Sequence, residues 1–428
     1  MNLISKKQLV KSFVGVGVMK LISIPISLLS SIILARSLGP EVFGQYSFVM
    51  ALIALIALPV HGGMPQLVTR EVSRFASYKV WPNYKGLIKA SYAWVLGMSV
   101  LIIVLYCLSY SVGLISDEGK WSMLLVAIFI IPLTGLSSIC NGVVKGLGLP
   151  VYSEIPGQLI QPILLLMFVA VMALFKSVNG MVAIWIQLIS SMIVFFVACY
   201  IFNQFQPVKL SGVKTEYCLS EWGKALLPFS VLALVSTLNV QIAVVILGLV
   251  GTDGQVATMR IAERGSQFVV LSLTLVNLII APHIVRAYHE GNRSKLQKLA
   301  KQCARGSVII SLPIAIVLIC WGEVLISITF GNEYVSSSYT PLVILVLAQL
   351  FNVFIGSVGH LLSMSGFERD TLVGHGFGLV INASLCLILS PQYGAVGAAI
   401  GVALGIVIWN LILSYMVVRR LGVKPTAL

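Results

Sequence analysis

Charged side chains are scarce in this sequence, and their scarcity excludes an ordinary soluble protein. Only 10% of the 428 residues are charged, whereas 58% are hydrophobic and the mean hydropathy is +1.00. Soluble globular domains carry charged side chains at about 25% of their positions. We therefore expect the chain to lie in a membrane.

Motifs for metal binding, catalysis and nucleotide binding are also missing. The seven cysteines are far apart, without C-x-x-C spacing or a histidine cluster, so we expect neither a disulfide framework nor a metal site. The loops between apolar segments are too short for a nucleotide-binding domain, which excludes transport driven by ATP within this chain. No Ser/His/Asp or Cys/His constellation can be assembled from neighbouring motifs, so we expect no enzyme and no cofactor.

Long apolar segments fill most of the sequence. A helix needs about 20 mostly apolar residues to cross the hydrocarbon core, and twelve segments meet this requirement. They cover residues 11–36, 41–63, 88–113, 121–144, 151–175, 180–202, 223–250, 254–284, 303–326, 337–364, 371–390 and 394–418. The sequence predicts an all-α integral membrane protein with about 12 transmembrane helices.

Basic residues are unevenly distributed over the loops between these segments. The formal net charge is +14, and 22 of the 28 Lys and Arg residues fall in the tails and in the loops on the same side as the N-terminus. Because cytoplasmic loops carry the excess of Lys and Arg, we place both termini in the cytoplasm. The basic residues form no stripe with interleaved aromatics, so a nucleic-acid partner is not expected.

Short sequences recur at about half the chain length. The turn Leu38–Glu41 after the first segment resembles Val250–Asp253 after the seventh. An even number of spans separates the equivalent helices, which indicates a parallel repeat with a pseudo-twofold axis along the membrane normal. We expect two pseudo-symmetric six-helix lobes, residues 1–206 and 207–428, around a central cavity.

Lys20 is predicted to lie inside the first span. It follows Lys11 by nine residues, or about 14 Å along a helix, which places it near the bilayer centre. A charge at that depth costs about 2.5–3.5 kcal/mol on insertion scales, so such residues usually face a bundle interior or a hydrated cavity. The alternative is that the stem of Lys20 runs along the helix and its ammonium group reaches the inner headgroups.

The eighth span carries a charged face. Arg260, Glu263, Arg264 and Gln267 follow helical spacing. Glu263 can pair with Arg260 at i, i+3 or with a neighbouring helix, and such a bridge would be purely local. One arginine is left over in either case, and together with Lys20 the membrane interior is predicted to hold three cations against this one carboxylate. We expect an electropositive cavity, with Glu263 and Gln267 as further polar or ion-coupling residues.

Other polar residues in the predicted spans allow two interpretations. Asn141, Glu154, His360 and His375 are candidates for lining the cavity or for coupling to H⁺ or Na⁺. Hydrogen bonding between helices accounts for such residues equally well. Glu154 also lies near the cytoplasmic end of its span, where exposure at headgroup level explains it.

Two stretches resemble a known family. Residues 33–46 (ILARSLGPEVFGQY) resemble the first helix-turn-helix of the polysaccharide biosynthesis (O-antigen type) flippases, and residues 393–401 (YGAVGAAIG) look like the start of that family's last span. This family belongs to the superfamily that also contains multidrug and toxin extrusion antiporters and lipid II flippases. The resemblance extends over essentially the whole chain.

The resemblance implies a flippase that works by alternating access in the bacterial inner membrane. Its substrate would be an undecaprenyl-diphosphate-linked oligosaccharide, an O-antigen or related repeat unit, moved from the cytoplasmic to the periplasmic leaflet. Lys20, Arg260 and Arg264 would engage the diphosphate, since an anionic headgroup needs cationic partners inside an apolar barrier. Membrane lipid, a polysaccharide polymerase and chain-length proteins are the candidate partners, and H⁺ or Na⁺ antiport could add driving force.

A cation-coupled multidrug antiporter of the same superfamily is the alternative function. Such antiporters commonly use cavity carboxylates for cationic substrates, whereas the predicted interior of this chain is net positive. That difference weighs against a drug pump.

Overall fold

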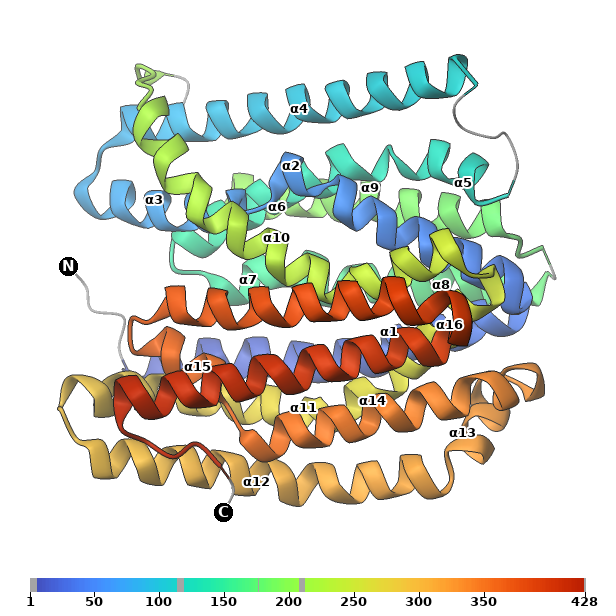
Figure 1. Cartoon of the computed structure of the whole chain (residues 1–428). Coiled ribbons are helices and arrows are strands. Elements are labelled where there is room, and N and C mark those ends of the chain that lie inside the picture. The colour runs from blue at the N-terminus through green and yellow to red at the C-terminus, as the bar shows by residue number, and fades with distance from the viewer. Residues whose placement is uncertain (1–5, 114–118, 176, 208–211, 427–428) are drawn as a thin grey trace. The chain divides into compact units, whose positions relative to one another are not determined.

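Most of the part of the chain that the structure describes is helical. The computed structural model describes residues 6–113, 119–175, 177–207 and 212–426, except for the side chains of residues 6–14, 278–279 and 281–282. Within these ranges the regular elements are all helices and no strand occurs (Figure 1). They are α1 (Lys6–Ile56), α2 (Leu58–His61), α3 (Met64–Tyr78), α4 (Trp81–Ser111), α5 (Lys120–Ala127), α6 (Ile130–Gly146), α7 (Pro150–Ile155), the π-helix η1 (Pro156–Ile160), α8 (Gln161–Leu174), α9 (Gly180–Gln204), α10 (Leu219–Val250), α11 (Asp253–His289), α12 (Arg293–Cys320), α13 (Gly322–Thr329), the 3₁₀-helix η3 (Asn332–Tyr334), α14 (Val335–Ile355), α15 (Val358–Met364) and α16 (Glu368–Leu421).

Many of these helices can cross a membrane. Among the described residues, nine helical stretches are long and apolar enough to do so. They are Gly15–Tyr78, Trp81–Ser111, Lys120–Gly146, Pro150–Leu174, Gly180–Gln204, Leu219–Val250, Arg293–Cys320, Asn332–Ile355 and Glu368–Leu421. A multi-pass membrane protein is therefore confirmed, and the count of about 12 spans stays a prediction.

Glycine interrupts the two longest helices. Gly39 in α1 has φ 73° and ψ 172°, and Gly394 in α16 has φ 55° and ψ −131°. These dihedrals are non-helical, and a Cβ atom disfavours positive φ, so glycine suits both bends. The bends coincide with the ends of predicted spans at residues 36–41 and 390–394.

The two arms of α16 pack closely against each other. A Cβ atom at Gly397 would lie 2.4 Å from the carbonyl oxygen of Leu389, and one at Gly401 would lie 2.7 Å from Sγ of Cys386. Gly397 and Gly401 repeat every fourth residue, a spacing that puts small residues on one helix face and lets two backbones approach. The close contact depends on the absence of side chains at these positions.

Glycine also interrupts the second and the tenth predicted spans. The second span was expected to run to residue 63, but α1 ends at Ile56 and the amphipathic helix α3 follows after Gly63, whose φ is 79°. The tenth span was expected to be continuous over 337–364, but Gly356, with φ 86°, separates α14 from α15. In both cases apolar composition continues across a glycine at which the backbone turns.

The chain forms two compact units. The first consists of Met1–Leu38 and Val49–Thr237, and the second of Gly39–Phe48 and Leu238–Leu428. Both α1 and α10 contribute residues to each unit. The expected lobes, residues 1–206 and 207–428 around a central cavity, stay a prediction.

Each unit has its own packing. In the first unit α6 packs against α3, α4 and α9. In the second unit α11 and α14 pack against each other and against α12 and α16. A buried apolar cluster, which includes Ile284, Leu362 and Val417, joins α11, α15 and α16 of the second unit. Within each unit the helices therefore hold polar side chains at defined positions.

Candidate functional site

The charged face of α11 lies in the second unit. Thr252 caps the helix by accepting a hydrogen bond from the Gln255 backbone N–H, and the Gln255 side chain accepts one from the Thr252 N–H. This reciprocal arrangement satisfies backbone donors at the helix start. The segment Gly39–Phe48 packs against the same point, where Gln45 donates to Asp253 at 3.0 Å. A Cβ atom at Gly44 would lie 1.7 Å from the Asp253 carbonyl oxygen, so this contact requires glycine.

Arg260 holds the only carboxylate of this face. Its Nη1 lies 2.9 Å from Oε2 of Glu263, and its Nη2 donates to Oε1 of Gln241 at 2.8 Å. Both members of the ion pair are largely shielded, with side-chain exposures of 17% and 16%. The i, i+3 pair that the spacing allowed is present.

Arg264 is the second arginine of this face. It is half-buried, and among the residues that the structure describes it makes no hydrogen bond or ion pair. Arg260, Glu263 and Tyr46 lie within electrostatic range of it. Two guanidinium groups therefore accompany one carboxylate, and the face carries a net positive charge.

Two polar cavities in the second unit collect most of the predicted coupling residues. A cavity of about 160 Å³ is lined by Glu263 and Gln267, and a cavity of about 190 Å³ is lined by His360 and His375. Trp409 lines both, and its ring lies edge-on to His375 with the ring centroids 4.8 Å apart. The structure thus brings four predicted residues to neighbouring cavities.

Amide side chains that the prediction left out of the site connect these cavities. Asn239 donates to the His375 carbonyl oxygen at 3.2 Å, and Asn410 donates to Asn352 at 3.1 Å. Asn382 lines the smaller cavity. Such residues carry no charge, and the sequence alone does not distinguish amides that line a cavity from amides that only join helices. These residues are recognised as cavity residues because the structure brings them together at the same two cavities.

A polar cavity in the first unit contains Asn141 and Glu154. It has a volume of about 490 Å³ and is lined by Pro65, Gln66, Thr69, Arg70, Ser138, Asn141, Gly142, Lys145, Ser153, Glu154 and Phe229. Nζ of Lys145 lies 3.0 Å from Oε1 of Glu154. The π-helix η1 begins two residues after Glu154, and such helices are rare and frequent at functional sites. We call this space the α3–α6 cavity.

Lys20 lies in the first unit but does not line the α3–α6 cavity. It is half-buried on α1, one turn before Ser23, whose hydroxyl donates to Oε1 of Gln158 at 3.4 Å. Lys20 and the two arginines of α11 belong to different compact units. A cavity shared by Lys20, Arg260 and Arg264 stays a prediction.

Arg70 is a cavity residue that the sequence prediction assigned only to membrane topology. Its guanidinium group lies over the Phe229 ring, 5.3 Å from the centroid, and 2.8 Å from Oε1 of Glu71. Arg74 approaches the other oxygen of Glu71 at 3.1 Å. The amphipathic spacing of α3 is the sequence signal that could have indicated a packed helix here.

Replacing the carboxylate of Glu71 should weaken the first unit. The Glu71 side chain is 4% exposed, and a Glu71→Gln variant loses the charge in both ion pairs, so we expect a loss of about 1–3 kcal/mol in unfolding free energy. Glu290→Gln is the matched control, because Glu290 pairs with Lys295 at 2.9 Å but is 45% exposed. That change should cost less than about 1 kcal/mol. Thermal unfolding of the purified variants in detergent measures the stability loss of each. Equal losses would contradict the claim that the Glu71 pairs matter more because Glu71 is buried.

Comparisons with known proteins identify a family for the sequence. Residues 33–339 match the family described as "Polysaccharide biosynthesis protein". The chain is also similar to the probable low-salt glycan biosynthesis flippase Agl15 of Haloferax volcanii, with 23% identity over 186 residues. That match covers 42% of this chain and only 38% of the relative.

Solved structures show the fold. The chain superposes on an inward-facing multidrug resistance transporter of the MATE family and MOP superfamily with a TM-score of 0.78, at 14% identity and covering 95% of this chain and 98% of that one. The lipid II flippase MurJ, in an inward closed conformation, superposes with a TM-score of 0.72 at 15% identity, covering 94% of this chain and 86% of MurJ. A MOP superfamily transporter from Pyrococcus furiosus superposes with a TM-score of 0.65 at 16% identity, covering 96% of each chain. The expected all-α membrane fold is confirmed.

Proposed function

Because the chain belongs to the polysaccharide biosynthesis protein family, we propose that it is a flippase for a lipid-linked oligosaccharide. The substrate in this proposal is an undecaprenyl-diphosphate-linked repeat unit of a surface polysaccharide such as O-antigen. It moves from the cytoplasmic to the periplasmic leaflet of a bacterial inner membrane, with both termini of the protein in the cytoplasm. The match over residues 33–339 supports the polysaccharide pathway.

The net positive face of α11 is the observation that carries the choice of an anionic headgroup. Arg260 and Arg264 flank one carboxylate, and Glu263 is already held by Arg260. A guanidinium group binds phosphate oxygens through two parallel hydrogen bonds, and such charge-assisted bonds are strong where water is excluded. Arg264 is the member of this face that is ready to bind a phosphate, with Arg260 and Lys20 as the further cations of the proposed site.

Alternating access moves the headgroup in this mechanism. The diphosphate and the sugars would pass through hydrated polar space, while the polyprenyl chain would remain outside that space. An inside-negative membrane potential favours the outward movement of anionic charge by about 2.3 kcal/mol per charge per 100 mV. The cavities lined by Glu263, Gln267, His360 and His375 are candidate places for a coupling H⁺ or Na⁺.

A cation-coupled multidrug antiporter is the second candidate, and the fold likeness to the MATE transporter favours it. The charge of α11 argues against it, since two arginines and one glutamate would repel a cationic drug.

Deletion of the gene tests the choice between these functions. A flippase mutant should lose surface polymer and accumulate lipid-linked repeat units on the cytoplasmic side, because synthesis continues while export stops. Extraction of lipid-linked oligosaccharide and mass spectrometry measure this accumulation, and reconstitution of the purified protein in vesicles with the extracted lipid measures flipping directly. Normal polymer together with increased drug susceptibility would favour the antiporter instead.

A further inference from the structure

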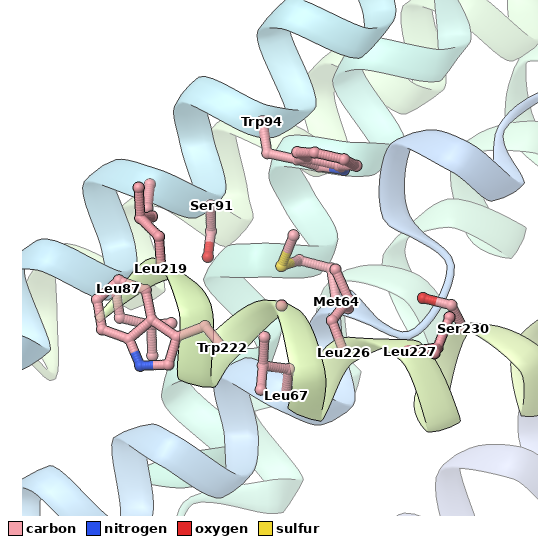
Figure 2. Close-up of a pocket in the computed structure, with 12 residues that line it drawn as sticks. Met64, Leu67, Leu87, Ser91, Trp94, Leu219, Trp222, Leu226, Leu227 and Ser230 are labelled. Atoms are coloured by element: carbon pink, nitrogen blue, oxygen red, sulfur yellow. The ribbon is translucent and has the colours of Figure 1, made fainter. Parts of the chain in front are cut away.

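A second cavity of the first unit has no charged or amide side chain in its lining, in contrast to the α3–α6 cavity. It has a volume of about 450 Å³ and lies among α3, α4 and α10. Figure 2 shows the side chains that surround it, with Ser91 and Trp94 of α4 on one side and Met64, Leu226 and Leu227 on the other. Its lining residues are Met64, Leu67, Leu87, Ala90, Ser91, Trp94, Leu219, Trp222, Gly223, Leu226, Leu227 and Ser230. We call this space the α4–α10 groove.

Two of the polar side chains in the groove already bind the backbone. The indole N–H of Trp94 donates to the Pro59 carbonyl oxygen at 3.1 Å, and the Ser230 hydroxyl donates to the Gly62 carbonyl oxygen at 2.9 Å. Methionine, leucine and alanine side chains make up most of the remaining wall. The groove therefore favours a hydrocarbon occupant.

Two contacts fix α10 on either side of the groove. Just before α10 begins, the Glu216 N–H donates to the Pro82 carbonyl oxygen at 3.2 Å. Further along, α10 rests on the turn before α3, where a Cβ atom at Gly63 would lie 2.5 Å from the Ser230 nitrogen. Between these two contacts, a Cβ atom at Gly223 would meet nothing within 4 Å. The gap follows from how α10 is fixed at the two ends of this stretch.

The groove and the α3–α6 cavity share a wall. On α3, Met64 and Leu67 face the groove, whereas Gln66 and Arg70 face the cavity. On α10, Ser230 lines the groove and its neighbour Phe229 lines the cavity. The two spaces therefore lie next to each other, and the exposed guanidinium group of Arg70 is within the same region as the groove, so a head at Arg70 and a hydrocarbon chain in the groove can belong to one molecule.

Charge along the polar side favours an anionic head. Arg70 and Lys145 line the cavity, and Arg74 lies one turn beyond Arg70. These three cations are accompanied by two carboxylates, those of Glu71 and Glu154. The side chains of the three cations are 50–52% exposed, so each can reach a further partner. The net charge of this group is positive.

We propose that the α4–α10 groove holds the polyprenyl chain of the substrate while its diphosphate binds at Arg70 and Lys145. This inference rests on the proposed function, and it assigns a loading site within the first unit. By the predicted orientation, α4 and α10 begin on the cytoplasmic side, so Leu87–Trp94 lies roughly 9–20 Å into α4. The groove is then in the inner leaflet, where the substrate is made. A phospholipid carries two chains, whereas a polyprenyl lipid carries one, which a single groove can hold.

Crosslinking tests the occupant of the groove. p-Benzoylphenylalanine is placed at Leu227, which lines the groove and is 66% exposed, or at Leu234, two turns further along α10, 42% exposed and outside the groove. The purified full-length protein is irradiated in detergent with undecaprenyl diphosphate, alone or with excess phosphatidylglycerol. We expect a lipid adduct at Leu227 that phosphatidylglycerol does not displace and at least tenfold less adduct at Leu234. Equal yields at both positions, or displacement by phosphatidylglycerol, would overturn the proposal in favour of general lipid contact.

Filling the groove tests the same site without a crosslinker. Gly223→Phe adds a ring where the groove has open space, and we expect at least a tenfold loss of undecaprenyl diphosphate binding, measured by native mass spectrometry. Gly223→Ala and Gly97→Phe are the controls and should bind as the wild type does, because Gly97 lies on α4 outside the groove with nothing within 4 Å of its Cβ position. Unchanged binding by Gly223→Phe would overturn the groove assignment.

The head of the substrate has its own measurement. Arg70→Gln should reduce the preference of the protein for undecaprenyl diphosphate over undecaprenol at least fivefold and leave undecaprenol binding unchanged. An unchanged preference would overturn the assignment of the diphosphate to Arg70. The flippase function is tested separately by wild-type flipping in vesicles, so that function can hold while the groove assignment fails.

Discussion

Cells that carry Lys20→Gln together with Arg264→Gln should lose surface polysaccharide while the protein stays in the membrane. Each change removes a cation from the proposed diphosphate site, and a hydrogen bond to a charged group contributes about 1.5–3 kcal/mol. Two such losses correspond to at least about a 100-fold decrease in substrate affinity. Quantification of polymer on whole cells, with immunoblots of membrane fractions, measures the effect.

A second pair of substitutions controls for the loss of positive charge. Lys298→Gln with Arg369→Gln also removes two cations, but both side chains are exposed and lie outside the predicted spans. We expect normal polymer from this pair. The double variant Lys20→Arg with Arg264→Lys keeps both charges but loses the two parallel hydrogen bonds of the Arg264 guanidinium group, so its polymer should lie between that of the Gln pair and that of the wild type. Unaltered polymer in the Lys20→Gln, Arg264→Gln cells would refute a role for these cations in binding the diphosphate.

The Gly397→Ala variant should be the most destabilised of the single substitutions considered. The new methyl group would lie 2.4 Å from the Leu389 carbonyl oxygen and 2.9 Å from the Ser390 nitrogen, and both are backbone atoms that no side-chain rotation can move. Overpacking of this kind costs about 1–3 kcal/mol and occasionally more. We expect a loss near the upper end, about 3 kcal/mol, in thermal unfolding of the purified protein.

Gly376 provides the matched control in the same helix. A Cβ atom there would meet nothing within 4 Å, so Gly376→Ala should be neutral or stabilising by up to about 1 kcal/mol, as expected for alanine in a helix. If Gly397→Ala and Gly376→Ala unfold at the same temperature, the two arms of α16 do not pack as described.

The sequence predicts the bends at Gly39 and Gly394 correctly because each follows from local information. Gly39 stands before Pro40 between two apolar runs, and Gly394 separates the last two predicted spans. Each has a positive φ that favours glycine. The i, i+3 pair of Arg260 and Glu263 is also local, since helical spacing alone brings the two side chains together.

The cavities could not be predicted in the same way. Arg70 follows a glycine-containing turn and lies in a basic stretch, so its charge alone indicates membrane topology. Its position in the α3–α6 cavity depends on α6 and on Phe229 of α10, far away in sequence. The α4–α10 groove likewise exists because α10 is fixed near Glu216 and Ser230 and leaves space at Gly223.

By itself the sequence determined that the protein lies in a membrane, which family it belongs to, and where the bends at Gly39 and Gly394 fall. Apolar content, loop charge and glycine positions act within one helix or one turn, so they can be seen without coordinates. Only the tertiary structure decided which polar residues share a cavity, because that depends on the distance and rotation between helices that are remote in the chain. The convergence of His360 and His375 near Trp409 and the apolar groove beside Arg70 arise from such packing.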